Sequence, residues 1–330
     1  MTTFETDRCA DPNSIPDRVD DRIAFLSAKL AEPCSPAASF LGQALEEKYP
    51  GAVVLLYGSA GSVLAEADPT DIMFDFYVIV PSYKDAFPSP IMRWANILLP
   101  PNVFFHVGMS PFGKLQAKYA VLSFEHFDRL LSKRTFHSYF WARFAQPFKI
   151  VAGPPEGANR IISLAAQAID VFLARVRPLS SADAPMMKED IDRIWQLGLS
   201  HSYRAELRAE DRGRAAQLLS TYGELPQKTT PYHIVQDLND SRYDRRLAAW
   251  AWRLRILQGG ILSILRLLKA SFTFQGGVDY IVWKIRRHSG IEIPVNEWHR
   301  RHPFIAAPLL GVRYYNLLAE RKRQSRRTAD

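Results

Sequence analysis

Two short stretches of the chain carry residues that could bind a triphosphate and a metal ion. The apolar run that begins at residue 52 ends in Tyr57, Gly58 and Ser59. A glycine lets backbone N–H groups approach phosphate oxygens, and a neighbouring serine adds a hydroxyl. A second apolar run, over 74–80, carries Asp75. Because Mg²⁺ prefers oxygen ligands such as carboxylates and phosphates, the two stretches predict a site for a nucleoside triphosphate with its magnesium.

Asp71 is a candidate for a second metal ligand, because it lies four residues before Asp75. The two side chains share one face of the strand if the strand already runs at residue 71. Nucleotidyltransferases usually place these acids two residues apart, and here Met73 and Tyr77 occupy those positions. The order of apolar strand, Gly-Ser turn, short connection and acid-bearing strand indicates a nucleotidyltransferase fold, against the alternative of an ordinary α/β turn.

Hydrophobic periodicity predicts the elements that position these residues. A polar N-terminal arm over 1–34, with a short helix near 23–30, precedes a helix that begins at Ser35 and Pro36. We then expect strands over 52–57, 74–80, 103–107, 115–122 and 147–151, and helices over 90–99, 124–133 and 136–145. Residues 35–155 therefore form an α+β domain, a mixed sheet with helices.

After a Gly-Pro-Pro linker at 153–155, residues 156–290 form a helical part, with apolar periodicity over 161–175, 191–199, 214–219 and 247–269. The last of these alternates apolar blocks with arginines and carries Trp250 and Trp252, and Trp283 follows it. No apolar run reaches the roughly 18 residues of a membrane-spanning helix. The pattern favours an amphipathic helix that lies on a membrane surface, and the alternative is the core of a helical domain.

Composition and charge narrow the class of protein. An apolar content of 47% in 330 residues belongs to a folded chain. The two cysteines, Cys9 and Cys34, lack the neighbours of a zinc site, and the N-terminus lacks a secretion signal, so we expect a bacterial cytoplasmic protein. Residues 241–330 hold 18 Lys or Arg against 6 Asp or Glu, within a net charge of +8. This end should meet an anionic partner, and its Trp and Leu favour lipid over nucleic acid.

Seven short blocks carry a resemblance to a known family. They are 56–59 (LYGS), 74–76 (FDF), 102–105 (NVFF), 117–123 (AKYAVLS), 142–150 (ARFAQPFKI), 198–202 (GLSHS) and 269–277 (KASFTFQGG). In this order they resemble the mitochondrial translocator assembly and maintenance proteins, which are phosphatidate cytidylyltransferases. Each block is short, but a common order of all seven is hard to obtain by chance.

The resemblance implies a nucleotidyltransferase domain over 35–155, a helical winged-helix-like domain over 156–290 and a basic amphipathic tail over 291–330 that contacts a membrane. The implied reaction is attack by the phosphate of phosphatidic acid on the α-phosphorus of CTP, with pyrophosphate leaving and CDP-diacylglycerol as the product. Mg²⁺ is the implied cofactor. We therefore expect an enzyme bound peripherally to the cytoplasmic side of the inner membrane.

The resemblance also implies roles for individual residues. Ser59, Asp75 and Lys118 are the expected catalytic residues: Ser59 with Gly58 cradles the triphosphate, Asp75 with Asp71 binds magnesium, and Lys118 neutralises phosphate charge. The attacking phosphate is already an anion, so no strong general base is required. The other candidates are Tyr57, Arg143 and Lys149 for the nucleotide, and His201, Arg204 and Lys269 for the lipid. Exposed strand residues, surface salt bridges or a solvated basic face are the alternatives for the basic side chains.

Two other functions stay open at this stage. One is a nucleotidyltransferase that acts on another small molecule or on RNA. The other is a catalytically inactive family member that binds lipid or nucleotide, because Pro81 and Ser82 stand where the family has an acid after the acidic strand. Residues 60–62 (AGS) also replace the family's Gly-Val.

Overall fold

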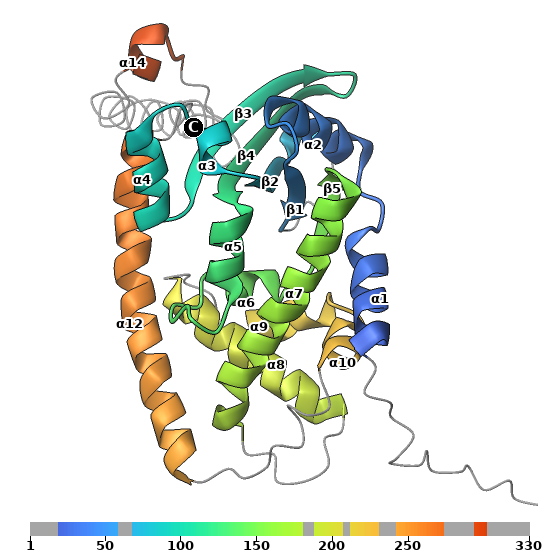
Figure 1. Cartoon of the computed structure of the whole chain (residues 1–330), viewed down its shortest axis with the longest axis vertical. Coiled ribbons are helices and arrows are strands. Elements are labelled where there is room, and N and C mark those ends of the chain that lie inside the picture. The colour runs from blue at the N-terminus through green and yellow to red at the C-terminus, as the bar shows by residue number, and fades with distance from the viewer. Residues whose placement is uncertain are drawn as a thin grey trace, which may run out of the picture.

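The computed structural model of the chain describes residues 19–58, 68–180, 188–206, 212–230, 242–273 and 294–301. Within these residues the protein is α+β, with one sheet in the upper part of Figure 1 and helices packed below and beside it. Ser59 and most of the predicted tail over 291–330 lie outside the described residues. Their predicted roles therefore stay predictions.

The sheet is five-stranded and mixed, as predicted. Its strands are β1 (Val53–Tyr57), β2 (Met73–Val80), β3 (Asn102–Ser110), β4 (Gly113–Ser123) and β5 (Phe148–Ala152). Their spatial order is β3-β4-β2-β1-β5. Only β2 and β4 run parallel, and the other neighbours are antiparallel. β2 therefore lies at the centre of the sheet, where both neighbours protect its backbone.

Helices surround the sheet on both faces. They are α1 (Val19–Leu30), α2 (Pro36–Lys48), α3 (Tyr83–Ala86), α4 (Pro90–Leu98), α5 (Phe124–Leu131), α6 (Trp141–Phe144), α7 (Pro155–Val176), α8 (Lys188–Ala205), α9 (Arg212–Ser220), α10 (Leu225–Thr229), α12 (Arg242–Thr273) and α14 (Glu297–Arg301), with the 3-10 helices η3 (Pro69–Asp71) and η4 (Arg177–Leu179). α2 begins as predicted, because the Ser35 hydroxyl accepts a hydrogen bond from the Ala38 amide and Pro36 occupies the first turn.

The helix predicted over 136–145 is shorter in the structure, where only α6 is an α-helix. The Phe136 carbonyl accepts a hydrogen bond from Arg255 Nε at 3.0 Å, and the Arg255 guanidinium lies 4.6 Å from the centre of the Phe136 ring. This carbonyl is therefore bound to α12 instead of to a following helical turn.

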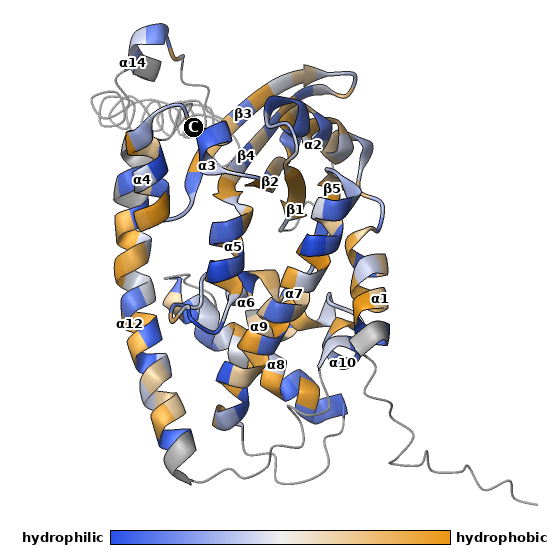
Figure 2. Ribbon diagram, viewed as in Figure 1, coloured by the Kyte–Doolittle hydropathy of each residue, from blue (hydrophilic) through white to orange (hydrophobic). Residues whose placement is uncertain are grey.

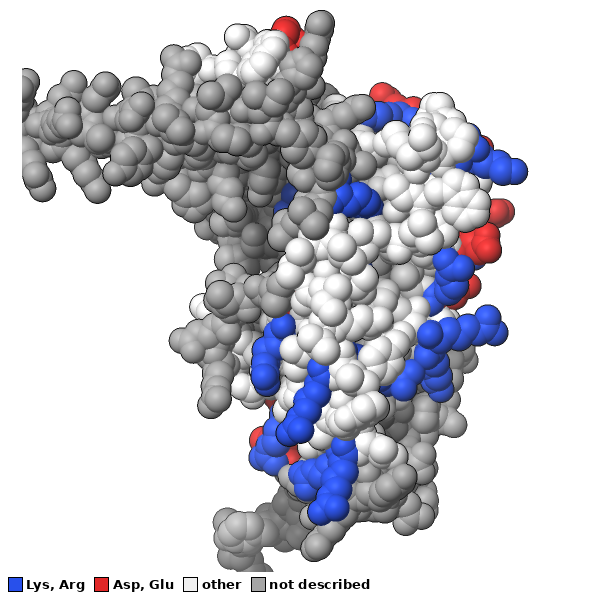
Figure 3. Space-filling model, turned by 90° about the vertical axis from the view of Figure 1, so that its left-hand side faces the viewer, with Lys and Arg blue, Asp and Glu red and all other residues white. Residues whose placement is uncertain are grey.

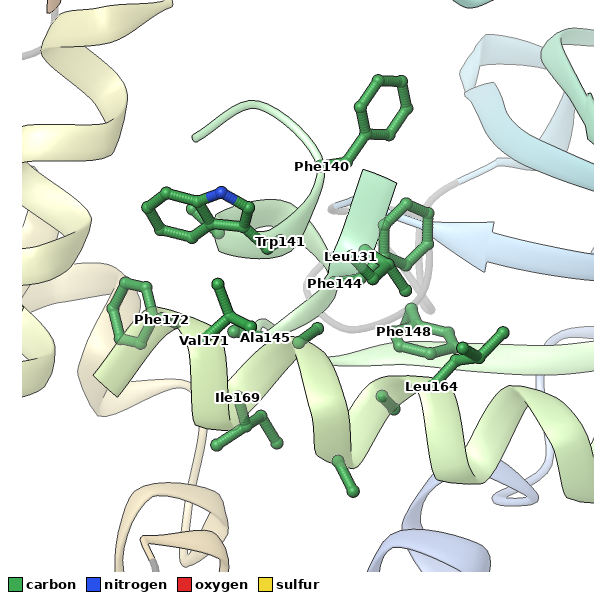
Figure 4. Packing of buried hydrophobic residues seen from close by; sticks show 14 of the residues in the cluster. Leu131, Phe140, Trp141, Phe144, Ala145, Phe148, Leu164, Ile169, Val171 and Phe172 are labelled. Carbon is green, nitrogen blue, oxygen red and sulfur yellow. The ribbon is translucent and has the colours of Figure 1, made fainter. Parts of the chain in front are cut away.

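The side chains of the sheet alternate between two cores. Val54, Leu56 and Phe76 face one core, which α2 covers, while Val53, Leu55 and Tyr77 face the other. The second core contains residues of α1, α5, α6, α7, α8 and α12. Figure 4 shows its aromatic centre, where Phe144 and Phe148 pack near Leu164 of α7.

This larger core extends across the domain boundary predicted at 155. It joins β1 residues Val53 and Leu55 to Phe172, Trp195 and Trp252 of the helical part. α1, predicted as part of a polar arm, also belongs to it, because Leu26 and Leu30 are buried. After residue 155 the described residues form helices, and a winged-helix-like arrangement stays a prediction.

The segment predicted as helical over 247–269 is part of α12, which extends further at both ends. Its hydropathy alternates along its length, as Figure 2 shows. Among the described residues, no helix is both long enough and apolar enough to cross a membrane.

Candidate functional site

The candidate site centres on an ion pair between two neighbouring strands. Asp75 on β2 lies opposite Lys118 on β4 in the parallel register, so their side chains leave the same face of the sheet. Lys118 Nζ lies 2.9 Å from Asp75 Oδ1, a charge contact without the alignment of a hydrogen bond. The side chains are partly buried, at 40% and 34% exposed respectively, and Asp75 Oδ1 is itself buried, so solvent reaches only part of the pair.

The end of β1 lies next to this ion pair. Tyr57, the last residue of β1, lies opposite Asp75 on the other side of β2, and Gly58 follows it with φ +86°. A side chain is strained at such a φ, and a Cβ at Gly58 would lie 3.5 Å from Asp75 Oδ2. The glycine therefore brings backbone next to the carboxylate, and its predicted contact with a triphosphate stays a prediction.

Asp75 and Asp71 are the candidate carboxylate ligands for a magnesium ion at this site. Asp71 is exposed and lies in η3, and β2 begins only at Met73. Asp71 and Asp75 therefore do not share one face of a continuous strand, as a pair of metal ligands on β2 would require. Within the described residues no group of three or more His, Cys, Asp or Glu could hold a metal ion. Mg²⁺ needs only one or two carboxylates when phosphate oxygens and water supply the other ligands, and Asp75 can be that carboxylate.

Arg143, a predicted nucleotide ligand, lies buried beneath the site. Its Nη2 lies 2.6 Å from Glu206 Oε2, and its Nη1 donates to the Tyr77 hydroxyl at 3.2 Å. The guanidinium also lies 5.1 Å from the Tyr57 ring centre and 4.4 Å from that of Tyr139. Burial alone would lower the pKa of Arg143, but Glu206 and the tyrosines raise it well above its ordinary value. In this structure Arg143 connects α8 to the strands of the site.

Gln146 forms a second buried network that the sequence did not indicate. Its Oε1 accepts hydrogen bonds from the hydroxyls of Tyr57 at 3.3 Å, Tyr203 at 2.8 Å and Tyr222 at 2.8 Å. Its Nε2 donates to the Ala142 carbonyl at 2.8 Å. The tyrosines lie 57 to 89 positions away in sequence, so no local pattern joins them to Gln146. The only signal was its place in the block over 142–150.

The structure does not bring Lys149 to the Asp75 site. Its neighbours Phe148 and Ile150 pack on the same side of the sheet as Asp75, so Lys149 leaves the opposite face. Lys149 Nζ donates to the Pro33 carbonyl at 2.7 Å and lies 3.9 Å from Glu32. Its contacts therefore join β5 to the connection between α1 and α2.

The three predicted lipid ligands do not form one cluster. The half-buried His201 packs against the Trp252 ring at 5.2 Å, its Nδ1–H donates to the Leu197 carbonyl at 2.9 Å, and burial lowers its pKa. Arg204 is exposed on α8. Seventeen helical residues, about 25 Å of helix rise, separate Trp252 from Lys269 on α12. One lipid headgroup could therefore not contact both His201 and Lys269.

Lys269 instead anchors the end of α12 to the connection between α4 and β3. Its Nζ donates to the Leu99 carbonyl, to the Pro101 carbonyl at 3.0 Å and to Asn102 Oδ1 at 2.9 Å. Burial, and secondarily the charge of Arg266, lowers the pKa of Lys269 to about 8. These contacts give Lys269 a structural role in the described residues.

The site as a whole offers a partly exposed carboxylate, an ammonium and a glycine at the end of β1, all on neighbouring strands. Such an arrangement can bind a phosphate chain and balance its charge, because each group reaches the same face of the sheet. No family model and no curated protein matches the chain, so comparison with known proteins assigns neither a family nor a function to it.

Proposed function

We propose that this protein transfers a cytidylyl group from CTP to phosphatidic acid and releases pyrophosphate. The proposal assigns residues 35–155 to a nucleotidyltransferase fold and the helical part to a winged-helix-like unit. The observation that supports it best is the exposed Asp75–Lys118 pair beside the Gly58 turn. The resemblance of the seven sequence blocks supplies the choice of CTP and phosphatidic acid.

In the proposed reaction, a phosphate oxygen of phosphatidic acid bonds to the α-phosphorus of CTP, and the bond to the pyrophosphate oxygen breaks. Asp75 would hold a magnesium ion that arrives with the nucleotide, and this ion would supply positive charge against the negative charge of the phosphates. Through this ion, Asp75 would fix the position of the triphosphate beside the strands. Lys118 Nζ, now against Asp75, turns towards a phosphate oxygen, where a positive charge is most valuable as negative charge shifts to the leaving group.

A product assay on the full chain tests this proposal. We expect CDP-diacylglycerol and pyrophosphate from Mg²⁺, phosphatidic acid and CTP, and much less product with the other three triphosphates. Asp75→Asn should lower the rate by about a thousandfold, since it removes the negative charge that would hold the metal ion, and the ion is what would bind the phosphates. Asp71→Asn is the matched control and should change the rate by less than about threefold, because Asp71 lies exposed in η3.

A mild effect of Asp75→Asn would contradict the site assignment. Loss of activity in both variants would instead restore Asp71 as a metal ligand. Thermal unfolding of each variant should match the wild-type chain, which separates lost chemistry from lost folding.

A second candidate is a protein that binds nucleotide or lipid without catalysis. It is favoured by the finding that the described residues contain no group of three or more His, Cys, Asp or Glu that could hold a metal ion. In that case calorimetry would detect CTP binding that Asp75→Asn weakens, while the product assay stays at background. An RNA substrate is less well supported, since the basic helix α12 also exposes large apolar side chains such as Trp250 and Leu257.

A further inference from the structure

The outer side of α12 exposes large apolar side chains at helical spacing. Trp250 is 60% exposed, Leu257 63%, Ile261 53% and Ile264 52%. These positions follow one another at intervals of seven, four and three, so they form one stripe along the helix. The opposite side is buried, with Trp252 and Arg255 in the core. More than half of each of these side chains therefore faces away from the packed core of the described residues.

The short helix α4 has a stripe of the same kind, which the sequence did not indicate. Ile91 is 79% exposed, Trp94 63% and Leu98 77%. They lie at intervals of three and four and therefore share one side of α4. The other side is anchored, because the buried Asn96 donates to the Val121 carbonyl at 2.8 Å and accepts from the Asn102 amide. Three of the most exposed apolar side chains in the described residues thus occupy one rigid helix.

Hydrogen bonds from α12 hold these two helices together. Arg266 Nε donates to the Pro100 carbonyl at 2.7 Å, and Lys269 Nζ donates to the Leu99 carbonyl and to Asn102 Oδ1. Leu99 and Pro100 directly follow α4, so its C-terminal end is fixed to the C-terminal part of α12. Figure 1 shows α4 beside the upper part of α12 on the left side of the protein.

The charges on these helices have one predominant sign. α12 contains seven Arg or Lys and one acid, and α4 contains one Arg and no acid. Arg245, Arg246 and Arg253 are exposed near the apolar stripe. Figure 3 views this side of the protein and shows an uncharged face with a cluster of Lys and Arg towards its lower end. Apolar side chains, tryptophans and bordering arginines are the composition that binds the interface of an anionic bilayer.

We propose that α4 and α12 together form a docking surface for an anionic lipid bilayer. Ile91, Trp94 and Leu98 of α4 enter the acyl boundary beside the apolar stripe of α12, and the exposed arginines contact the headgroups. The occupant is a bilayer because both stripes are apolar and exposed, they carry tryptophans, and the charge beside them is positive. This proposal adds α4 to the proposed function as a second membrane contact. It rests on the proposed function only for the identity of the acceptor lipid.

The position of this surface suits an acceptor that resides in the membrane. Lys269 holds Asn102 at the start of β3, and Phe105, three residues further along β3, lies opposite Lys118 on β4. Three strand residues correspond to about 10 Å. A phosphate headgroup at the edge of the docking surface therefore lies within a short distance of the Asp75–Lys118 pair.

Flotation of the full chain with vesicles tests the surface without using catalysis. We expect the protein to float with vesicles of phosphatidylcholine and phosphatidylglycerol, and to float far less with phosphatidylcholine alone or at high salt. The triple variant Ile91→Ser, Trp94→Ser and Leu98→Ser should weaken binding by about a hundredfold, because three large apolar side chains no longer insert. Arg246→Gln with Arg253→Gln should weaken it by about tenfold.

The β3–β4 hairpin provides the matched control. Val107, Met109 and Phe112 are 40%, 77% and 41% exposed and belong to the part of the β3–β4 hairpin whose tip points away from α4 and α12 in Figure 1, so their replacement by serine should leave flotation within about twofold of wild type. Equal losses in both triple variants would overturn the surface, as would wild-type protein that does not float. A dimer that only the α4 variant dissociates, with flotation unchanged, would overturn it in favour of a second copy of the chain.

Two further results separate this proposal from the proposed function. Asp75→Asn should float like the wild-type chain, because the ion pair lies outside the docking surface; a loss of flotation would count against the assigned surface. Wild-type protein that floats and yields no nucleotide-lipid product would refute the enzyme and support the docking surface.

Discussion

Two ion pairs on the same side of the sheet differ in how much water reaches them. Asp75–Lys118 has side chains 34% and 40% exposed, while the side chains of Arg143 and Glu206 are 11% and 9% exposed. An exposed pair contributes little to stability and remains available to a ligand. A buried pair has left water, so each member depends on its partner. The difference agrees with the proposed ligand binding at the first pair, whereas the second pair joins the residue that directly follows α8 to α6, beside the sheet.

The largest stability effect should come from breaking the buried pair. Glu206→Ala leaves Arg143 charged and without its carboxylate, which should cost about 3–5 kcal/mol of unfolding free energy. Glu206→Gln keeps a hydrogen-bond acceptor and should cost less. Denaturant unfolding measures both values, and Asp75→Ala, which breaks the exposed pair, should cost less than about 1 kcal/mol.

The comparison would fail if Asp75→Ala destabilised the chain as much as Glu206→Ala. It would also fail if Glu206→Gln abolished nucleotide binding while the fold stayed intact, since Glu206 would then belong to the site. A chain with Glu206→Ala that is too unstable to purify still allows the test through Glu206→Gln.

A smaller loss should follow from Gln146→Leu. The substitution removes the acceptor of three tyrosine hydroxyls, of which Tyr203 and Tyr222 are buried, and should cost about 2–3 kcal/mol. Gln167→Leu is the control, because Gln167 only donates to Asp128 at a partly buried position and should cost less than about 1 kcal/mol. Equal midpoints of thermal unfolding for the two variants would show that the tyrosine network adds nothing to the buried region.

The strands could be predicted from the sequence, because apolar runs that end at turn residues specify them locally. β1 and β2 begin within one residue of their predicted starts, and Gly58 has the positive φ that its place in the turn requires. Arg143 could not be assigned, since its partner Glu206 lies 63 positions further along the chain. The alternation along β5 predicts that Lys149 points to the opposite side of the sheet from Phe148 and Ile150. Which helices cover each side depends on the order of the strands, which the sequence does not specify locally.

The smallest effect should come from Lys149, the basic residue that leaves the opposite face of the sheet. Lys149→Gln keeps a donor for the Pro33 carbonyl and loses only a 3.9 Å contact with Glu32, so stability should change by less than about 0.5 kcal/mol. Its effect on KM for CTP should stay within about twofold, whereas Lys118→Gln should lower kcat by about a hundredfold. A matching loss of kcat in Lys149→Gln would mean that the nucleotide extends around the edge strand β5 to the other face. Ligand binding could then no longer be assigned to the Asp75–Lys118 side of the sheet alone.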